Sequence, residues 1–424
     1  MIDIKLIREK PRLVQKSCKD RGYDVNINNL LRLDKKFREL KLKSDSLRSR
    51  RNAVAQEINK LKKAGKDIRA KVKQAKKIPG EIGKVEEEIK KLSSQIRDIM
   101  LHIPNTMQED VPVGDESKNK KIKEWGEKKK YSFKVKPHWQ IGQELGILDL
   151  ERAAKLAGSG FYVLVGDGAR LQRALVQFML DFHNKHGFTE INPPQIVSAK
   201  TMTGTGNLPK FEEDVYRTRE GLYLIPTAEV PLTNMHADEI LELKELPKKY
   251  CAFTECYRTE AGRHGAETRG IFRLHQFEKV EMVMITHPAK SWEALEDMRS
   301  KAERMLELLG IPYRTLVLAT QDAGFAAAKT YDIECWAAAN DRYLEVSSCS
   351  NCTDFQARRM NTRARVQQGN AFVHTLNGSG LALPRLMISI LENYQNEDSS
   401  ITIPKILQPY MGGQKKISRH KKEK

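Results

Sequence analysis

The sequence of 424 residues lacks the features of a membrane or secreted protein. No apolar run approaches the ~18 residues that a membrane-spanning helix needs, so we expect no membrane partner. Residues 1–11 are charged and contain no apolar stretch of the kind found in a secretory signal. Six cysteines in a chain of this length do not make a disulfide framework. Together these absences predict a cytoplasmic protein with reduced thiols.

Two common nucleotide-binding motifs are absent as well. The chain contains no G-x-x-x-x-G-K-[ST] phosphate loop, and no G-x-G-x-x-G string follows a predicted strand. The short GSG string at 378–380 is too weak to predict a nucleotide site by itself. Any bound nucleotide must therefore be held by side chains. Arginine suits this task, because its planar guanidinium can donate two parallel hydrogen bonds to one phosphate.

Positive charge is abundant and unevenly distributed. The formal net charge is +19, which suits a polyanionic partner. Residues 1–101 contain 29 Lys and Arg against 14 Asp and Glu, and residues 415–424 contain six against one, so the region between them is close to neutral. Such an excess is also typical of a solvated face on an exposed helix, and charge alone leaves both interpretations open.

Two heptad runs occupy the basic N-terminal region. Their seam positions alternate three and four residues apart, as in paired helices that pack along one stripe. The first run comprises Leu33, Phe37, Leu40, Ser44, Leu47, Arg51, Val54, Ile58 and Leu61, and the second comprises Ile82, Val85, Ile89, Leu92, Ile96, Ile99 and Ile103. Gly65 lies between the runs and can end the first helix. The pattern predicts an antiparallel helical hairpin.

Two details of this hairpin lead to specific expectations. Pro79 should break or kink the returning helix and leave residues 69–78 as a separate short helix. Arg51 is polar at a seam position and can reach solvent from the edge of the seam. Together with Arg48 and Arg50 it makes a basic cluster denser than packing requires.

The chain divides into four regions by composition. Residues 1–105 hold the hairpin, residues 106–137 are polar and Lys-rich and predict a linker, residues 138–411 mix helix and strand patterns, and residues 412–424 form a basic tail that we expect to be disordered. In the third region we expect helices at 171–186, 292–309 and 386–394, and strands at 188–197, 271–285, 316–318 and 344–347. Strands separated by long, uneven insertions predict an α+β fold with an antiparallel sheet.

The string ECYRTE at 255–260 and the residues that follow it combine charge with bulk. Arg258 and Glu260 are two residues apart, so they share one face of a strand, and so do Phe277 and Glu281. One interpretation is a nucleotide site, in which the arginine holds a phosphate, the aromatic ring stacks on a base and the carboxylates bind ammonium or ribose groups. The other interpretation is a set of solvent-facing ion pairs on a sheet.

These strings resemble the seryl-tRNA synthetase family of class II aminoacyl-tRNA synthetases, over nearly the whole chain apart from the tail. Residues 255–281 resemble motif 2 of that class. The other matching strings are FTEINPP (188–194, motif 1), TGTGNLPKF (203–211), PTAE (226–229), LEVSSCSN (344–351), FQARR (355–359) and HTLNGSGLALPR (374–385, motif 3). The resemblance implies a coiled-coil tRNA arm followed by an antiparallel sheet flanked by helices.

The resemblance also implies a ligand for each group of residues. L-Serine should be bound by Thr227, Ala228, Glu229, Arg258, Glu281, Thr375 and Ser379. ATP should be bound by Arg258, Thr259, Glu260, Leu274, Phe277, Glu345, Val346, Ser347, Ser348 and Arg385. Glu345 and Ser348 would hold Mg²⁺, which prefers oxygen ligands, and no zinc is expected. Arg258, Glu281 and Arg385 are the expected catalytic residues.

The implied reaction needs no protein nucleophile. The serine carboxylate attacks the α-phosphorus of ATP, and the terminal ribose hydroxyl of tRNA then attacks the adenylate. Arg258 would lie where negative charge builds at phosphorus. The implied partners are tRNA(Ser), with tRNA(Sec) as a further candidate, and a second copy of the chain paired through motif 1. Arg48, Arg50 and Arg51 are the expected tRNA contacts.

Two other functional classes compete with this interpretation. A ligase that loads an amino acid onto a carrier protein would share the body, but such relatives lack the helical arm. A non-catalytic coiled-coil binder of nucleic acid would keep the arm, but a decayed body should have lost at least one of Arg258, Glu281, Glu345 and Arg385, and all four are present.

Two smaller signals also have alternative interpretations. Cys349 and Cys352 have the spacing of a metal or redox pair, but without a second ligand pair we interpret them as structural thiols. His264 and His275 could act as acid–base groups. We expect His264 instead on a substrate loop and His275 in a structural role.

Overall fold

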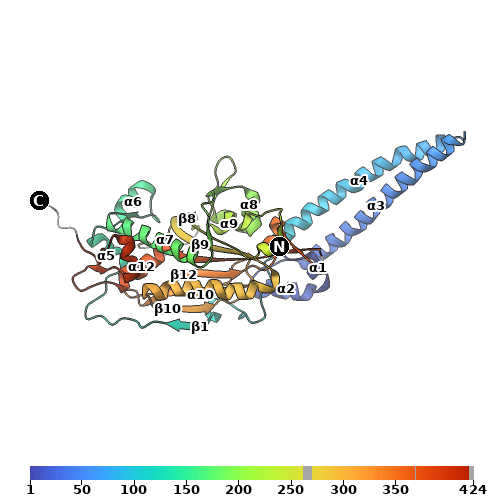
Figure 1. Ribbon diagram of the computed structural model, residues 1–424. Helices are drawn as coiled ribbons and strands as arrows, with labels where there is room; N and C mark the ends of the chain where they lie inside the picture. The colour runs from blue at the N-terminus through green and yellow to red at the C-terminus, as the bar shows by residue number, and fades with distance from the viewer. Residues whose placement is uncertain (261–269, 368, 420–424) are drawn as a thin grey trace. The chain divides into compact units, whose positions relative to one another are not determined.

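A computed structural model describes residues 1–260, 270–367 and 369–419 (Figure 1). The chain forms two compact units, residues 2–104 and residues 105–424. None of the helices in the described ranges is long and apolar enough to cross a membrane. Each unit has its own apolar clusters.

The first unit is entirely helical in its regular structure. It contains α1 (Ile4–Glu9), α2 (Pro11–Asp20), α3 (Ile27–Lys63) and α4 (Arg69–Leu101). Helices α3 and α4 pack along the predicted seam, where Leu47 and Val54 of α3 and Ile82 and Val85 of α4 are buried together. Helix α3 ends at Lys63, and Gly65 follows with φ +67°. The predicted antiparallel hairpin is therefore confirmed (Figure 1, blue).

Pro79 was expected to break or kink the returning helix, and the break is wrong. Helix α4 runs without interruption from Arg69 to Leu101, with Pro79 inside it. Proline removes one backbone hydrogen bond from a helix, but the neighbouring side chain Ile78 is 1% exposed and packs in the seam with α3. Burial of that side chain offsets the lost hydrogen bond, so no separate short helix forms at residues 69–78.

The polar seam positions of α3 behave differently from each other. Ser44 is buried, whereas Arg51 is exposed, as expected for a long side chain at the edge of a seam. Arg48 and Arg50 are exposed too. The guanidinium of Arg48 lies 2.6 Å from a carboxylate oxygen of Glu86 on α4, so one of the three arginines also joins the two helices.

The second unit is built on one large sheet. Among its described residues eight strands pair in the order β1-β10-β11-β12-β15-β9-β8-β4. They are β1 (Lys120–Trp125), β10 (Tyr313–Val317), β11 (Lys329–Ala337), β12 (Arg342–Asn351), β15 (His374–Ala382), β9 (Gln276–Thr286), β8 (Lys248–Tyr257) and β4 (Thr189–Glu190). All neighbours are antiparallel except β4 and β8. The predicted α+β class with an antiparallel sheet is confirmed.

Three long helices cover one face of this sheet. They are α7 (Asp167–Lys185), α10 (Ser291–Leu309) and α12 (Leu383–Asn393), which match the helices expected at 171–186, 292–309 and 386–394. The opposite face carries α8 (Ala199–Thr205), α9 (Glu229–Asn234) and α11 (Phe355–Met360). The remaining helices are α5 (His138–Glu144) and α6 (Leu150–Ala157).

The side chains of strand β9 pack alternately on the two faces of the large sheet. Met282 and Met284 belong to the apolar cluster under the long helices, whereas Val283 belongs to the cluster that packs against α9. Successive side chains of a strand point to opposite faces. Lys279 and Glu281 therefore lie on the same face as Val283, away from the helical layer.

Short strands complete the unit. A three-stranded sheet contains β7 (Ile240–Glu242), β13 (Arg363–Val366) and β14 (Gly369–Phe372). Three two-stranded sheets pair β2 (Leu148–Asp149) with β3 (Val163–Leu164), β5 (Ile196–Val197) with β6 (Tyr223–Leu224), and β16 (Ile401–Thr402) with β17 (Lys416–Ile417). The strand expected at 188–197 forms as β4 and β5, with the two prolines between them.

Two regions are more ordered than their composition suggests. The expected linker at 106–137 contains β1, which pairs with β10 at the edge of the large sheet. The expected disordered tail is folded as far as residue 419, because β17 pairs with β16 and buries Ile417. Neither strand was predicted from the sequence, because both segments are hydrophilic. An edge strand and a two-residue strand need few apolar side chains. Residues 420–424 lie outside the described ranges.

Candidate active site

Two adjoining cavities lie on the face of the sheet that is opposite the long helices. Their volumes are about 380 Å³ and about 60 Å³, and Arg258, Lys279, Glu345 and Ser379 line both. Among the predicted residues, the larger cavity also contains Thr227, Glu229 and Ser348, and the smaller one contains Glu260, Leu274, Phe277 and Arg385. Predicted site residues that lie up to 158 positions apart in the sequence, from Thr227 to Arg385, therefore meet in one cleft.

One end of the larger cavity is a buried polar pocket around Glu229. The Glu229 carboxylate accepts a hydrogen bond of 2.7 Å from the Gln356 amide, and its backbone N–H donates to Thr227 Oγ1 at 3.2 Å. Burial, and then the nearby charge of Glu281, raise the pKa of Glu229 to about 7. This carboxylate is therefore poised to become fully ionised when a cation binds beside it.

Beside this pocket lies a buried ion pair on β9. Lys279 Nζ is 2.5 Å from a carboxylate oxygen of Glu281, which is fully buried. Lys279 also donates to Thr227 Oγ1 at 2.9 Å, and Asn377 Nδ2 donates to Glu281 at 3.3 Å. Strand register places Ser379 of β15 directly opposite Glu281. The group forms one hydrogen-bonded set at the floor of the cleft.

The smaller cavity combines arginines with an aromatic ring. Arg258 follows β8, and its guanidinium carbon lies 5.1 Å from the centre of the Phe277 ring. Arg273 donates to Glu260 at 3.4 Å. Arg385, in the first turn of α12, lies 3.1 Å from a carboxylate oxygen of Glu345. A flat ring in contact with an arginine, in a cavity that other arginines also line, suits a base that carries phosphates.

The residues expected to hold Mg²⁺ come together with a third oxygen donor. Glu345 and Ser348 line the larger cavity with Asp332, which is opposite Ser348 in the pairing of β11 with β12. Asp332 Oδ1 is buried and has no hydrogen-bond partner among the described residues. Burial, and then the charge of Glu345, raise the pKa of Asp332 well above its usual range. An all-oxygen set with an unpaired carboxylate atom fits a hard divalent cation.

Several predicted residues lie behind the cavity walls. Ala228 and Val346 are buried backbone neighbours of lining residues. Ser347 Oγ donates to the carbonyl of Ser379 at 2.5 Å, and Thr375 Oγ1 donates to Gln356 at 2.6 Å. Thr259 Oγ1 donates to the carbonyl of Glu213 at 2.7 Å, so its side chain faces away from the cleft.

Four residues that line the cleft or bind its carboxylates were not among the predicted site residues: Lys279, Gln356, Asn377 and Asp332. Lys279 could have been found, because it lies between Phe277 and Glu281 on one strand face. Gln356 and Asn377 lie inside matching strings but are neutral amides. Asp332 gave no signal, since only strand pairing brings it beside Ser348.

The alternative roles for histidine and cysteine find no support in the local contacts. The His275 ring stacks on Phe161 at 5.3 Å, and its Nδ1 lies 3.2 Å from the carbonyl oxygen of Arg258. Cys349 and Cys352 are buried free thiols, and burial raises the pKa of Cys349 to about 12. His264 lies outside the described residues. In the described ranges no group of three or more His, Cys, Asp or Glu side chains is arranged to hold a metal ion.

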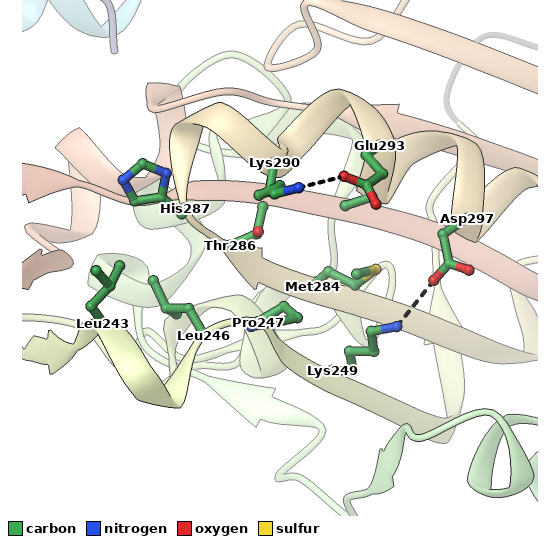
Figure 2. A pocket seen from close by; sticks show the side chains of 11 residues that line it. Leu243, Leu246, Pro247, Lys249, Met284, Thr286, His287, Lys290, Glu293 and Asp297 are labelled. Atoms are coloured by element: carbon green, nitrogen blue, oxygen red, sulfur yellow. Dashed lines mark hydrogen bonds and ion pairs between the residues drawn. The ribbon is translucent and has the colours of Figure 1, made fainter.

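A separate cavity of about 720 Å³ lies between β8, β9 and α10 (Figure 2). Its walls are apolar at Leu243 and Leu246 and carry ion pairs on the other side, including Lys249 with Asp297 at 3.0 Å. It is larger than the cleft, but no predicted site residue lines it. Size alone therefore does not identify the site in this fold.

Known proteins match both units of the chain. A seryl-tRNA synthetase N-terminal domain model matches residues 1–107, and a tRNA synthetase class II core domain model (G, H, P, S and T) matches residues 210–394. The chain is 50% identical to a serine–tRNA ligase of Fervidobacterium nodosum, covering 97% of this chain and 98% of that protein.

Two solved structures share the whole fold. Seryl-tRNA synthetase from Pyrococcus horikoshii, complexed with ATP, has a TM-score of 0.93 and 39% identity, covering 99% of this chain and 100% of that one. Cytoplasmic serine–tRNA ligase from Naegleria fowleri, in complex with AMP, has a TM-score of 0.88 and 33% identity, covering 99% of both chains.

The antiparallel sheet, the cleft and the core-domain match together define a class II aminoacyl-tRNA synthetase. Within that class, full-length identity of 50% to one relative sets the family. The chain belongs to the seryl-tRNA synthetase family, as the sequence analysis predicted.

The raised pKa of Glu229 predicts how stability depends on pH. A carboxyl group with a raised pKa in the folded protein contributes stability that is fully present below its unfolded value of 4.5 and is lost as pH rises through about 7. The Gln side chain of Glu229→Gln cannot titrate. Between about pH 5 and about pH 8 the free energy of unfolding of the wild type should therefore fall by up to about 3 kcal/mol relative to that of this variant. Urea unfolding of both proteins at the two pH values measures this. A difference that does not change with pH would contradict the assignment.

Proposed function

We propose that the protein is a serine–tRNA ligase, which forms seryl-adenylate from L-serine and ATP and transfers the seryl group to the 3′-terminal adenosine of tRNA(Ser). The observation that carries the proposal is the position of Arg258. It lines both cavities, between the buried carboxylates at one end and the ring of Phe277 at the other. That is where an amino acid and a nucleotide would meet.

The serine subsite is the polar pocket around Glu229. Thr227 and Glu229 bind the ammonium group, and Glu281 accepts a hydrogen bond from the hydroxyl. Ala228, Thr375 and Ser379 complete the pocket, with Thr375 acting through Gln356. Alanine is rejected because it would leave the buried polar groups unpaired, which costs more than the lost contact itself.

The ATP subsite is the smaller cavity and its rim. Phe277 stacks on the adenine, Glu260 and the neighbouring backbone bind its edge, and Arg385 binds the γ-phosphate. Thr259, Leu274, Val346 and Ser347 shape this subsite, with the last two and Thr259 supporting it from behind. The stacking role is supported by the cationic side chain that already lies on the ring at 5.1 Å.

Adenylate formation then proceeds by direct displacement. A serine carboxylate oxygen attacks the α-phosphorus, and the bond to the pyrophosphate leaving group breaks. Arg258 donates to the oxygens on which negative charge grows. The ribose hydroxyl of tRNA next attacks the seryl carbonyl, and AMP leaves.

Magnesium would be held by Glu345 and Ser348, with Asp332 as a third oxygen donor. When bound, the ion supplies positive charge that offsets the phosphates of ATP. The contribution of this chain is to place two carboxylates and a hydroxyl on neighbouring strands. Zinc plays no part in the proposed reaction.

The tRNA partner binds the hairpin of the first unit. Arg48, Arg50 and Arg51 project from α3 and are exposed. Contacts with RNA backbone suit such side chains, because they recognise charge and shape rather than base sequence. The same surface would accept tRNA(Sec) if its shape matches that of tRNA(Ser).

A second copy of the chain is the other proposed partner, in the cytoplasm. Strand β4, from motif 1, is a two-residue edge strand whose side chains are exposed, and Ile196 nearby is 51% exposed. An exposed edge strand beside an apolar residue favours pairing with another chain, and twofold symmetry is the commonest arrangement. The buried free thiols suit a reducing compartment.

The competing classes differ from this proposal in measurable ways. A carrier-protein ligase would form an adenylate but would not charge tRNA. A non-catalytic binder would bind RNA without any exchange of pyrophosphate into ATP. The cleft keeps Arg258, Glu281, Glu345 and Arg385 together, which favours the catalytic alternative.

Arg258→Ala should lower serine-dependent ATP–pyrophosphate exchange by at least ~100-fold, because the variant loses the donor to the developing phosphate charge. Wild-type exchange should require Mg²⁺ and no added zinc. Arg304→Ala, which removes an exposed arginine of α10, is the matched control and should retain exchange. Equal stimulation by alanine or threonine would sink the serine assignment, and normal exchange in Arg258→Ala would sink the role of that residue.

Replacing Arg48, Arg50 and Arg51 with glutamine should weaken tRNA charging and leave pyrophosphate exchange within a few-fold of normal. Deleting residues 28–101 should do the same more strongly. Each lost phosphate contact should also remove ~0.7–0.9 from the log–log slope of tRNA affinity against salt. Glutamine at three exposed lysines of the second unit, Lys155, Lys244 and Lys405, controls for lost charge. Normal charging by the truncated protein would contradict this division of labour.

Sedimentation of the purified protein at micromolar concentration should give the mass of a dimer. Ile196→Asp should shift the distribution toward monomer, because it places a charge beside the proposed contact. Leu42→Asp, at an apolar residue of α3 that is 71% exposed, should leave the mass unchanged. A monomer mass for the wild type would rule out the proposed pairing.

A further inference from the structure

A buried carboxylate outside the cleft, Glu392, joins elements that carry ATP-site residues. Glu392 lies on α12, two helical turns after Arg385, and is fully buried. Its Oε2 accepts from the backbone N–H of Ala339 at 3.0 Å, and its Oε1 accepts from the amide of Asn340 at 3.2 Å. These two residues form the turn that leads into β12, the strand of Glu345. The carboxylate therefore ties that turn to the helix of Arg385.

The same carboxylate fixes a buried histidine. His138, at the start of α5, is 4% exposed, and both its backbone N–H and its Nδ1 lie 3.1 Å from Glu392 Oε1. On the other side of the ring, the backbone N–H of Ile271 donates to His138 Nε2 at 3.2 Å. A backbone N–H can only donate, so Nε2 must be the unprotonated nitrogen and Nδ1 must carry the proton.

The neutral imidazole thus links Glu392 to the backbone that enters the ATP subsite. Ile271 is followed directly by Phe272, Arg273 and Leu274, which line the smaller cavity. Gly270 is required on the other side, because a Cβ there would lie 2.1 Å from His138 Nε2. A side chain at position 270 would therefore displace the ring or the backbone beside it.

The Phe272 ring is in contact with side chains from the same elements. Arg342, which follows the turn bound by Glu392, lies 4.7 Å from the centre of this ring, and Arg385 lies 5.0 Å from it. One aromatic ring is therefore in contact with a cation from β12 and a cation from α12. Its backbone is held through Ile271 by His138. All three segments that meet at the ring are also joined at Glu392.

We propose that Glu392 and His138 are a positioning pair for ATP, which fixes residues 271–274, the turn before β12 and α12 against one another. Neither residue lines the cleft, so both act through Phe272, Arg273, Leu274 and Arg385. The inference rests on the proposed function, because it takes ATP as the occupant of the smaller cavity. The serine subsite is formed by other segments, so the pair should affect ATP and not serine.

The test measures KM for ATP and for serine in pyrophosphate exchange, and the dissociation constant of ATP by calorimetry without serine. His138→Ala leaves the Ile271 N–H unpaired, so KM and the dissociation constant for ATP should rise roughly tenfold, with KM for serine within about twofold of normal. Glu392→Gln should act alike, because Ala339 and His138 use different oxygens of Glu392 and one of these positions becomes an NH2 group that cannot accept. His138→Gln should restore ATP affinity, since its amide offers a donor and an acceptor about as far apart as the ring nitrogens.

Tyr394→Phe is the matched structural control. It removes a hydrogen bond from the end of α12 to the carbonyl of Leu309, away from the ATP subsite. The control should lower the melting temperature and leave both KM values unchanged. If His138→Ala does not fold, the Glu392→Gln variant alone decides.

Unchanged ATP constants in a folded Glu392→Gln variant would overturn the positioning pair. So would parallel rises in the ATP and serine constants that follow the loss of melting temperature. Absence of serine-dependent exchange in the wild type would instead overturn the proposed function, and the ATP titration would still decide the role of the pair.

Discussion

The cost of burying charge governs the arrangement of the cleft. Glu281 and Asp332 are buried on central strands, and Glu229, beside them, is only partly exposed. An isolated buried carboxylate is expensive, so it must be paired, protonated or matched by a ligand. Glu281 meets this condition in one way and the other two carboxyl groups in another, and the difference corresponds to the chemistry proposed for them.

Glu281 is paired within the protein. Lys279 lies two residues away on the same strand face and provides an ion pair of 2.5 Å. This pairing keeps Glu281 ready to accept a hydrogen bond without depending on a ligand for its charge. Glu229 and Asp332 have raised pKa values, because burial and a nearby carboxylate oppose their ionisation. A cationic ligand beside either carboxyl group would offset the cost of ionising it. Part of the free energy of ligand binding would then come from the attraction between the ligand and this carboxylate.

The sequence predicted the parts of this structure that repeat or that occur as long strings. The heptads of α3 and α4 predicted the hairpin, because a seam of apolar residues can be buried in few ways. The cleft residues were predicted by family resemblance, and the structure brings most of them together. Lys279 could have been predicted, because alternate residues of a strand share one face and it lies between Phe277 and Glu281. Asp332 was not, since its place beside Ser348 is set by strand pairing between distant segments.

The failures have a common physical cause. Pro79 was expected to break a helix on local grounds, but seam packing at Ile78 overrides the local preference. Strand β1 and Ile417 were missed because their surroundings are hydrophilic, although a single buried residue or one paired edge is enough to order a short segment. Local composition predicts what a segment prefers alone, whereas tertiary contacts decide what it does in the folded chain.

The same reasoning explains the run of small residues before β12. Residues 337–339 are all alanine, a composition that predicts little about a turn. In the structure their backbone lies against α12, and the N–H of Ala339 reaches Glu392 at 3.0 Å. That N–H is one of the donors on which the fully buried carboxylate depends. A segment without informative side chains can thus matter through its backbone, because the N–H that binds Glu392 belongs to the main chain.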